Sequence, residues 1–334
     1  MELKDIEQAY QTLSQIIEIF QKQLDLSYFD ALIEALSDLL ENQINGKEEI
    51  DASTVAELEK LYRHLDLSEF SSEEIRQVIQ LLLLGSYKKE RVQPNHQMTP
   101  DSIGYLITFL IEKITSKEKL NSVLDLTVGT GNLLAVILNN LKSLGNQSLK
   151  AYGVDNDDTL LAIADVSLAL QRISNVELFH QDALDNLMLP QVDLVVSDLP
   201  VGYYPLDDRA AQFETHAAEG HSFAHYLLIE RGVEKLAENG WGLFVVPSGI
   251  FETEKAQPLL KMIQKNGYLQ GLLNLPRELF VSEKSRKAIL MVQKKGDQAH
   301  QASQILLGDF PSLKDKKEFN GFLDEINAWV KENQ

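Results

Sequence analysis

Acidic side chains end or follow three successive apolar runs in the middle of the chain. Asp125 and Asp155 close the first two runs, and Asp182 follows the third. Helical patterns separate the runs, and strands that alternate with helices form a parallel sheet whose carboxyl ends lie at one edge. We therefore expect the three carboxylates to line one ligand site at that edge.

A glycine turn follows the first run, in the segment VLDLTVGTGNLL (123–134). Gly129 and Gly131 allow a tight turn and a close approach of the backbone to a ligand. Leu134 stands where the dinucleotide fingerprint has its third glycine. Asp125 would repel a diphosphate but would attract a cation. The turn therefore favours S-adenosylmethionine (SAM), which carries an ammonium and a sulfonium, over NAD.

The second and third acids suit a nucleoside. Asp155 lies 24 residues after Gly131, where an acid at the end of a second strand can accept both ribose hydroxyls. Asp182 could accept from an adenine amino group. Any one of these acids alone is typical of a surface loop. Three of them, together with the glycine turn, predict a cofactor site.

A fourth apolar run ends in the motif SDLPVGYY (197–204). The motif delivers a further carboxylate, Asp198, to the same predicted edge. Alone, such a motif is typical of a structural strand end that leads into a glycine-containing turn. Beside a predicted cofactor site, the carboxylate becomes a candidate catalytic group.

These motifs, in this order, resemble class I SAM-dependent methyltransferases over residues 95–295. The resemblance is to their N6-adenine branch, especially the modification subunit of type I restriction systems and its small stand-alone bacterial relatives. Three further segments carry it: HQMTPDSIGYLI (96–107), the helix and strand at 222–251, and the hairpin at 272–295. It implies SAM as the cofactor, with the following cofactor-binding residues: Thr99, Asp125, Thr127, Gly129, Thr130, Gly131, Asn132, Asp155, Asn156, Asp182 and Asp198.

In that branch the fourth strand ends in Asn or Asp, Pro, Pro and an aromatic residue. The first side chain and the second main-chain carbonyl accept hydrogens from the acceptor nitrogen, and the aromatic ring stacks on a flipped-out base. Here the four positions are Asp198, Leu199, Pro200 and Val201, and valine cannot stack. Tyr203 or Tyr204 could supply the ring. The resemblance implies these catalytic residues: Asp198, Leu199, Pro200 and Tyr203.

The methyl acceptor stays open at this point. Adenine N6 in nucleic acid is the acceptor that the resemblance implies. A protein amide or a small molecule is an alternative, because a related signature serves amide nitrogens. A third reading is a SAM-binding regulatory protein whose catalysis has been lost. After the hairpin only about 40 residues remain, too few for a separate DNA target-recognition region.

The apolar pattern divides the chain into two parts. Residues 1–92 show apolar positions at helical spacing and no proline, which predicts a helical N-terminal domain of four to six helices that could bind a protein partner. The pattern of residues 93–334 predicts an α/β domain with a doubly wound, mostly parallel sheet and a short tail with one helix at 317–331. Seven runs are expected as strands, the last antiparallel: 122–127, 150–155, 176–180, 193–198, 241–247, 269–275 and 287–294.

Composition limits the function further. The net charge of −19 repels polyphosphate at long range, and the basic groups YKKER (87–91) and EKSRK (283–287) are interpreted as surface turns. The absence of cysteine excludes disulfides, zinc thiolates and cysteine nucleophiles.

His221 and His225 are four residues apart and could share a helix face, but no third ligand supports a metal site. The acidic start and the lack of a long apolar run favour a cytoplasmic protein without a membrane span.

Overall fold

The computed structural model describes residues 3–89, 93–115, 120–146, 148–253 and 255–333. Within these ranges the N-terminal part is helical, as predicted. It comprises α1 (Leu3–Leu24), α2 (Tyr28–Glu41), the 3-10 turn η1 (Lys47–Glu49), α3 (Ala52–Arg63) and α4 (Ser72–Lys89).

Side-chain caps begin two of these helices. Ser27 accepts a hydrogen bond from the backbone N of Asp30 at the start of α2, at 3.1 Å. Asp51 accepts from the backbone N of Ser53 and Thr54 at the start of α3, both at 3.0 Å. Such caps satisfy donors that the first turn of a helix leaves without a partner. The helix boundaries therefore follow from local sequence.

The α/β part begins with η2 (Pro94–His96) and α5 (Asp101–Ile114). Its sheet strands are β1 (Ser122–Asp125), β2 (Lys150–Asp155), β3 (Val176–His180), β4 (Val192–Asp198), β5 (Leu236–Pro247), β6 (Gly267–Asn274), β7 (Lys287–Lys294) and β8 (Leu306–Asp309). The connecting and terminal helices are α6 (Asn132–Ser143), α7 (Asp158–Leu170), α8 (Asp207–Ala210), α9 (Ala224–Lys235), α10 (Ala256–Asn266), η3 (Arg277–Leu279), η4 (Glu283–Ser285) and α11 (Lys316–Asn333).

The strands that the structure describes form one sheet in the order β3-β2-β1-β4-β5-β7-β6-β8. Neighbours from β3 to β5 are parallel, and β7 is antiparallel to both β5 and β6, as predicted. The expectation of seven strands is wrong, because β8 adds an eighth strand that pairs parallel with β6 among the described residues. β8 has four residues, two of them exposed, so the sequence there shows no buried apolar run.

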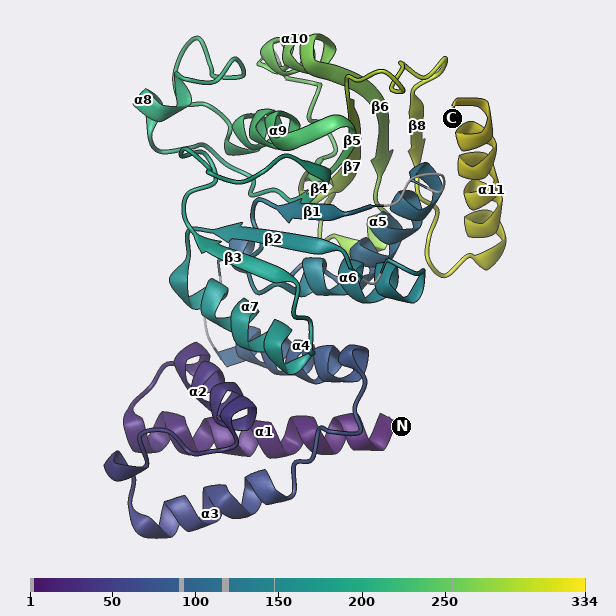
Figure 1. Ribbon diagram of the computed structural model, residues 1–334. Coiled ribbons are helices and arrows are strands. Elements are labelled where there is room, and N and C mark those ends of the chain that lie inside the picture. The colour runs from purple at the N-terminus through teal and green to yellow at the C-terminus, as the bar shows by residue number, and fades with distance from the viewer. Residues whose placement is uncertain (1–2, 90–92, 116–119, 147, 254, 334) are drawn as a thin grey trace.

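Two apolar layers cover the sheet. Residues of α5, α6 and α11 pack on one face, and residues of α9 and α10 pack on the other. The helical domain lies below the sheet in Figure 1, and α4 lies between the other N-terminal helices and α6. The core of the helical domain also includes Ile163 and Val166 of α7. The helical domain and the α/β part therefore share apolar contacts. No helix of the described residues is long and apolar enough to cross a bilayer.

Candidate active site

A cavity of about 280 Å³ opens at the carboxyl ends of β1, β2 and β4. Ten of the predicted cofactor-binding residues line it: Thr99, Asp125, Thr127, Gly129, Thr130, Asn132, Asp155, Asn156, Asp182 and Asp198. Gly131 is not among the described lining residues. The structure therefore brings together the acids that end β1, β2 and β4 and the acid that follows β3.

The glycine turn forms one wall. Gly129 and Gly131 adopt left-handed backbone angles, with φ of +52° and +77°, which other residues adopt only with strain. Gly131 also approaches α7 so closely that a Cβ there would lie 3.2 Å from the side chain of Ala164. Gly131 thus turns the chain into α6 and packs against α7.

Asp155 is held by the turn that faces it. Its Oδ2 accepts from the backbone N of Gly129 at 2.8 Å, and its Oδ1 accepts from the backbone N of Asp157 at 3.0 Å. Burial raises the pKa of Asp155 above its usual range, and the two hydrogen bonds oppose that shift. Each oxygen retains a lone pair that could accept from a ligand hydroxyl.

Asp125 is the most deeply buried of the site acids, with 1% of its surface exposed. Its Oδ1 accepts from the backbone N of Thr127 at 3.0 Å, whereas Oδ2 has no hydrogen-bond partner among the described residues. Burial raises the pKa of Asp125 to about 7; hydrogen bonding to Thr127 and Ser197 opposes that shift, and the charges of Asp155 and Asp198 add to it. A carboxylate in this position would be stabilised by a cationic ligand group.

Asp182 contacts one side chain of the loop that follows β4 and one of the helix α8. Its Oδ2 accepts from the hydroxyl of Tyr204 at 2.5 Å and from Nη1 of Arg209 at 2.8 Å, while Oδ1 accepts from the backbone N of Leu184 at 2.9 Å. The sequence predicts Asp182 as an acceptor for an adenine amino group. The structure places it in the cavity wall, where it also fixes the loop.

The end of β4 carries a contact that the sequence does not suggest. Asp198 accepts from the hydroxyl of Thr99 at 2.9 Å through Oδ2, and from Nζ of Lys287 at 2.5 Å through Oδ1. Its main-chain carbonyl accepts from the hydroxyl of Thr127 at 3.1 Å. Lys287 belongs to the segment interpreted above as a surface turn. That interpretation is wrong for Lys287, which lies at the start of β7 and lines the cavity.

Only some of the residues that follow Asp198 line the cavity, as far as the described residues show. Leu199 and Pro200 line the cavity, and the side chain of Asn95 pairs with both the N and the carbonyl O of Val201, at 3.2 Å each. Tyr203 is 58% exposed and stacks on Phe223 with 4.9 Å between ring centroids. Among the described residues it is Tyr204, and not Tyr203, that lines the cavity.

The histidines do not form a shared face. His221 precedes α9, which begins at Ala224, and it contacts Asp207 at 3.0 Å. His225 lies within α9, and burial lowers its pKa to about 4. Within the described ranges there is no group of three or more His, Cys, Asp or Glu side chains that could hold a metal ion.

A model of the N-6 DNA methylase family matches residues 82–327. The chain belongs to this family. A second model, for the YtxK N-terminal helical domain, matches residues 7–86. An uncharacterized protein of Bacillus subtilis strain 168, YtxK, is 37% identical over 327 residues, which is 98% of each chain.

Solved structures agree with this family assignment. A Listeria monocytogenes protein described as a candidate class I SAM-dependent methyltransferase is 40% identical, with a TM-score of 0.92 over 98% of this chain and 100% of the other. The methyltransferase subunit of a type I restriction-modification system from Streptococcus thermophilus shares the fold at 16% identity, with a TM-score of 0.65 over 95% of this chain and 74% of the other. Membership of the methylase family implies SAM as the cofactor.

The residues of the cavity fit that cofactor. Four aspartates line it, and Lys287 and Arg209 partly offset their charge, so the balance still suits a cation better than a diphosphate. The buried Oδ2 of Asp125, which has no partner among the described residues, offers an acceptor for an ammonium group. The fit is therefore one of charge and of hydrogen-bonding capacity.

Proposed function

We propose that this methylase-family protein transfers a methyl group from SAM to an amino nitrogen, and that adenine N6 in nucleic acid is the acceptor. The observation that carries the proposal is the position of Asp198, at the end of β4 and in the wall of the cavity that the other site acids line. A hydrogen-bond acceptor beside a site for a methyl donor suits a poorly nucleophilic nitrogen.

The site acids and Leu199 each have a role in this proposal. Asp155 would hold the ribose hydroxyls, Asp125 the ammonium, and Asp182 the adenine of the cofactor. When bound, SAM supplies an electrophilic methyl group on its sulfonium. Asp198 accepts a hydrogen bond from the nitrogen that receives the methyl group, which favours a pyramidal nitrogen with an available lone pair. The carboxylate charge balances the positive charge that develops on this nitrogen as it gains the methyl group, and the surplus proton then leaves to water. The main-chain carbonyl of Leu199 accepts the second hydrogen.

Lys287 modifies this chemistry. Its ammonium already occupies Oδ1 of Asp198 at 2.5 Å, so an acceptor nitrogen must share this carboxylate or displace the lysine. Val201, in the position of the family's aromatic residue, offers no ring for stacking on a base. These two features support testing acceptors other than adenine in the same experiment.

Transfer of labelled methyl groups from SAM to fractionated DNA, RNA, protein and small molecules tests the proposal. The proposal expects label in nucleic acid, recovered as N6-methyladenine. Asp198→Ala should lower turnover about a hundredfold, the scale for removing one positioned polar group, while SAM affinity stays within a few-fold. Asp193→Ala is the matched control, because Asp193 lies at the opposite end of β4 and accepts from the backbone of Asn121 and Ser122.

The other outcomes are equally informative. Label in protein or in small molecules would move the acceptor to a different class. Binding of SAM without transfer to any fraction would contradict an enzyme and favour a regulatory protein, in which the helical domain contacts a partner. Transfer that is unchanged in Asp198→Ala would show that the end of β4 is only structural.

A further inference from the structure

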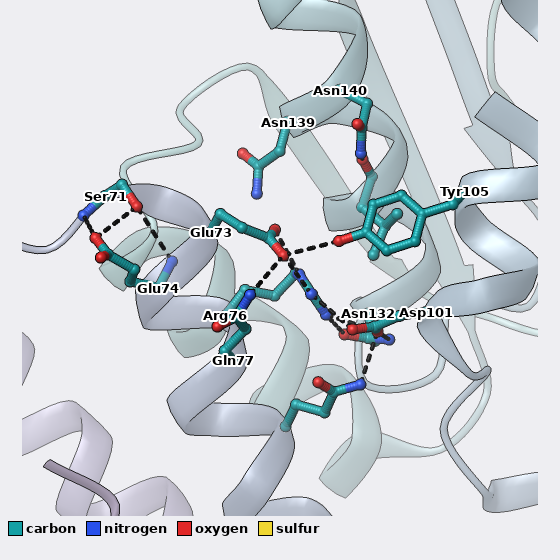
Figure 2. Close-up of polar contacts among 12 residues, drawn as sticks. Ser71, Glu73, Glu74, Arg76, Gln77, Asp101, Tyr105, Asn132, Asn139 and Asn140 are labelled. Carbon is teal, nitrogen blue, oxygen red and sulfur yellow. Dashed lines mark hydrogen bonds and ion pairs between the residues drawn. The ribbon is translucent and has the colours of Figure 1, made fainter. Parts of the chain in front are cut away.

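An arginine of the helical domain contacts a residue of the cavity wall. Arg76 lies on α4, and 2% of its side chain is exposed. Its guanidinium donates to Glu73 at 2.9 and 2.6 Å, to both oxygens of Asp101 at 2.8 Å, and to Oδ1 of Asn132 at 2.9 Å. Figure 2 shows these contacts converging from α4, α5 and α6. Among the described residues, Arg76 itself does not line the cavity.

Asn132 connects the arginine to the cavity wall. It is the first residue of α6, directly after Gly131. While Oδ1 accepts from Arg76, its Nδ2 donates to the main-chain carbonyl of Thr99 at 2.9 Å and to Asp101 at 3.2 Å. Arg76 therefore fixes which end of the Asn132 amide faces Thr99, because the guanidinium can only donate.

Thr99 carries the connection to the end of β4. Its carbonyl is held by Asn132, and its hydroxyl donates to Asp198 at 2.9 Å. A continuous series of hydrogen bonds thus runs from Arg76 through Asn132 and Thr99 to Asp198. Every member after Arg76 lines the cavity.

We propose that Arg76 is a positioning residue for the SAM site, so that α4 of the helical domain forms part of the cofactor-binding machinery. It acts through Asn132 and Asp101, which place Thr99 beside the glycine turn. The helical domain is then required for cofactor affinity, in addition to any role with a partner. This inference rests on the cavity being the SAM site, as the proposed function states.

The charges of the network support an ordered arrangement. Burial alone would raise the pKa of Glu73, but hydrogen bonds from Arg76 turn the net shift downward. Burial would lower the pKa of Arg76, yet its bonds to Glu73 and Asp101 hold that pKa above its usual value. Glu73 and Arg76 therefore stay ionised, and a planar fork with fixed donors holds its partners in one geometry.

A second arginine provides a matched control for simple domain attachment. Arg172 follows α7 and donates to the main-chain carbonyls of Phe70, Leu67 and Ser68 in the loop before α4. It joins the same two domains but contacts no residue of the series from Arg76 to Asp198. If Arg76 only attaches the domains, the two arginines should behave alike.

Calorimetric titration with SAM and its demethylated product separates these cases. Arg76→Lys keeps the charge but loses the fork, so we expect cooperative unfolding to persist and both ligands to bind about tenfold more weakly, the effect of losing a charge-assisted contact. Arg172→Lys should lower the melting temperature and leave the affinity within about twofold. Wild-type affinity in Arg76→Lys would overturn the proposal.

A double-variant cycle tests whether the effect passes through Asn132. Asn132→Ala should weaken binding, and adding Arg76→Lys should then weaken it little further, because interacting residues are non-additive. Simple addition of the two effects would contradict a role through Asn132. If Arg76→Lys does not fold, Glu73→Gln replaces it and should weaken binding a few-fold; an unchanged affinity would overturn the proposal. If the wild type binds neither ligand, the proposed function fails as well.

Discussion

Two donors reach the carboxylate of Asp198, and they have different consequences. Thr99 donates to one oxygen, whereas Lys287 would compete for the other with the acceptor nitrogen of the proposed reaction. The side chains of Lys287 and Asp198 are 25% and 16% exposed, so we take the pair to be worth about 1 kcal/mol, or roughly fivefold. Lys287→Met should lower the KM for the acceptor by about that factor. Steady-state kinetics on the identified acceptor would measure it, and an increase in KM would show that Lys287 instead binds the acceptor.

The pKa of Asp125 predicts how cofactor binding depends on pH. Because its folded-state pKa is raised to about 7, the ligand-free protein holds this proton more tightly than the unfolded chain. The stability that protonated Asp125 contributes is therefore lost as pH rises from about 4 to 7. A cationic ligand prefers the ionised form, so SAM should bind about tenfold more weakly at pH 6 than at pH 8. Calorimetry at both pH values checks this, and Asp125→Asn should remove the difference. An equal affinity at both pH values in the wild type would refute the assignment.

Residues at strand ends were predictable, whereas their partners were not. Asp125, Asp155, Asp182 and Asp198 could be found because an acid after an apolar run marks the ligand-binding edge of a parallel sheet. Lys287 lies 89 residues from Asp198, and Arg76 lies 56 residues from Asn132. No local sequence pattern indicates a contact between residues that lie so far apart along the chain. Neither does the sequence show which of two adjacent tyrosines enters the cavity.

The second helix contains a buried acid whose ionisation opposes stability. Asp38 of α2 is 2% exposed and accepts from the backbone N of Asn45 and the hydroxyl of Tyr62. Burial raises its pKa to about 7, and Glu34 and Glu41 add to the shift. The same sign holds as for Asp125, so stability falls as pH rises from about 4 to 7. Asp38→Asn should raise the unfolding free energy at pH 8 by about 1 kcal/mol. Denaturant unfolding at pH 5 and pH 8 measures this. An equal gain in unfolding free energy at both pH values would show that the gain does not come from the ionisation of Asp38.

Long elements followed from the sequence more readily than short ones. The predicted helix of the tail appears as α11, and the antiparallel pairing of β6 and β7 follows from their short connection. β8 was missed because an edge strand of four residues buries one side only and carries no periodic signal. The docking of α4 against α6 was missed for a different reason, since it depends on side chains from both domains.

The whole molecule carries a net charge of −19, which limits its approach to nucleic acid. We expect weak, steeply salt-dependent binding to duplex DNA with little sequence preference. Gel-shift titrations at several salt concentrations check this. Strong, sequence-selective binding by the isolated chain at physiological salt would contradict it. A basic partner subunit bound to the helical domain could supply the missing affinity.

Calorimetric titration of the wild type and of Asp155→Ala shows whether the acids at the strand ends form a SAM site. Asp155 is held by the glycine turn through Gly129 and is expected to accept the ribose hydroxyls. Loss of a charge-assisted contact of this kind costs about 1.5–3 kcal/mol. The wild type should bind SAM and its demethylated product, and Asp155→Ala should bind both about ten- to a hundredfold more weakly. Equal affinity in the two proteins, or tight binding of NAD by the wild type, would contradict the claim.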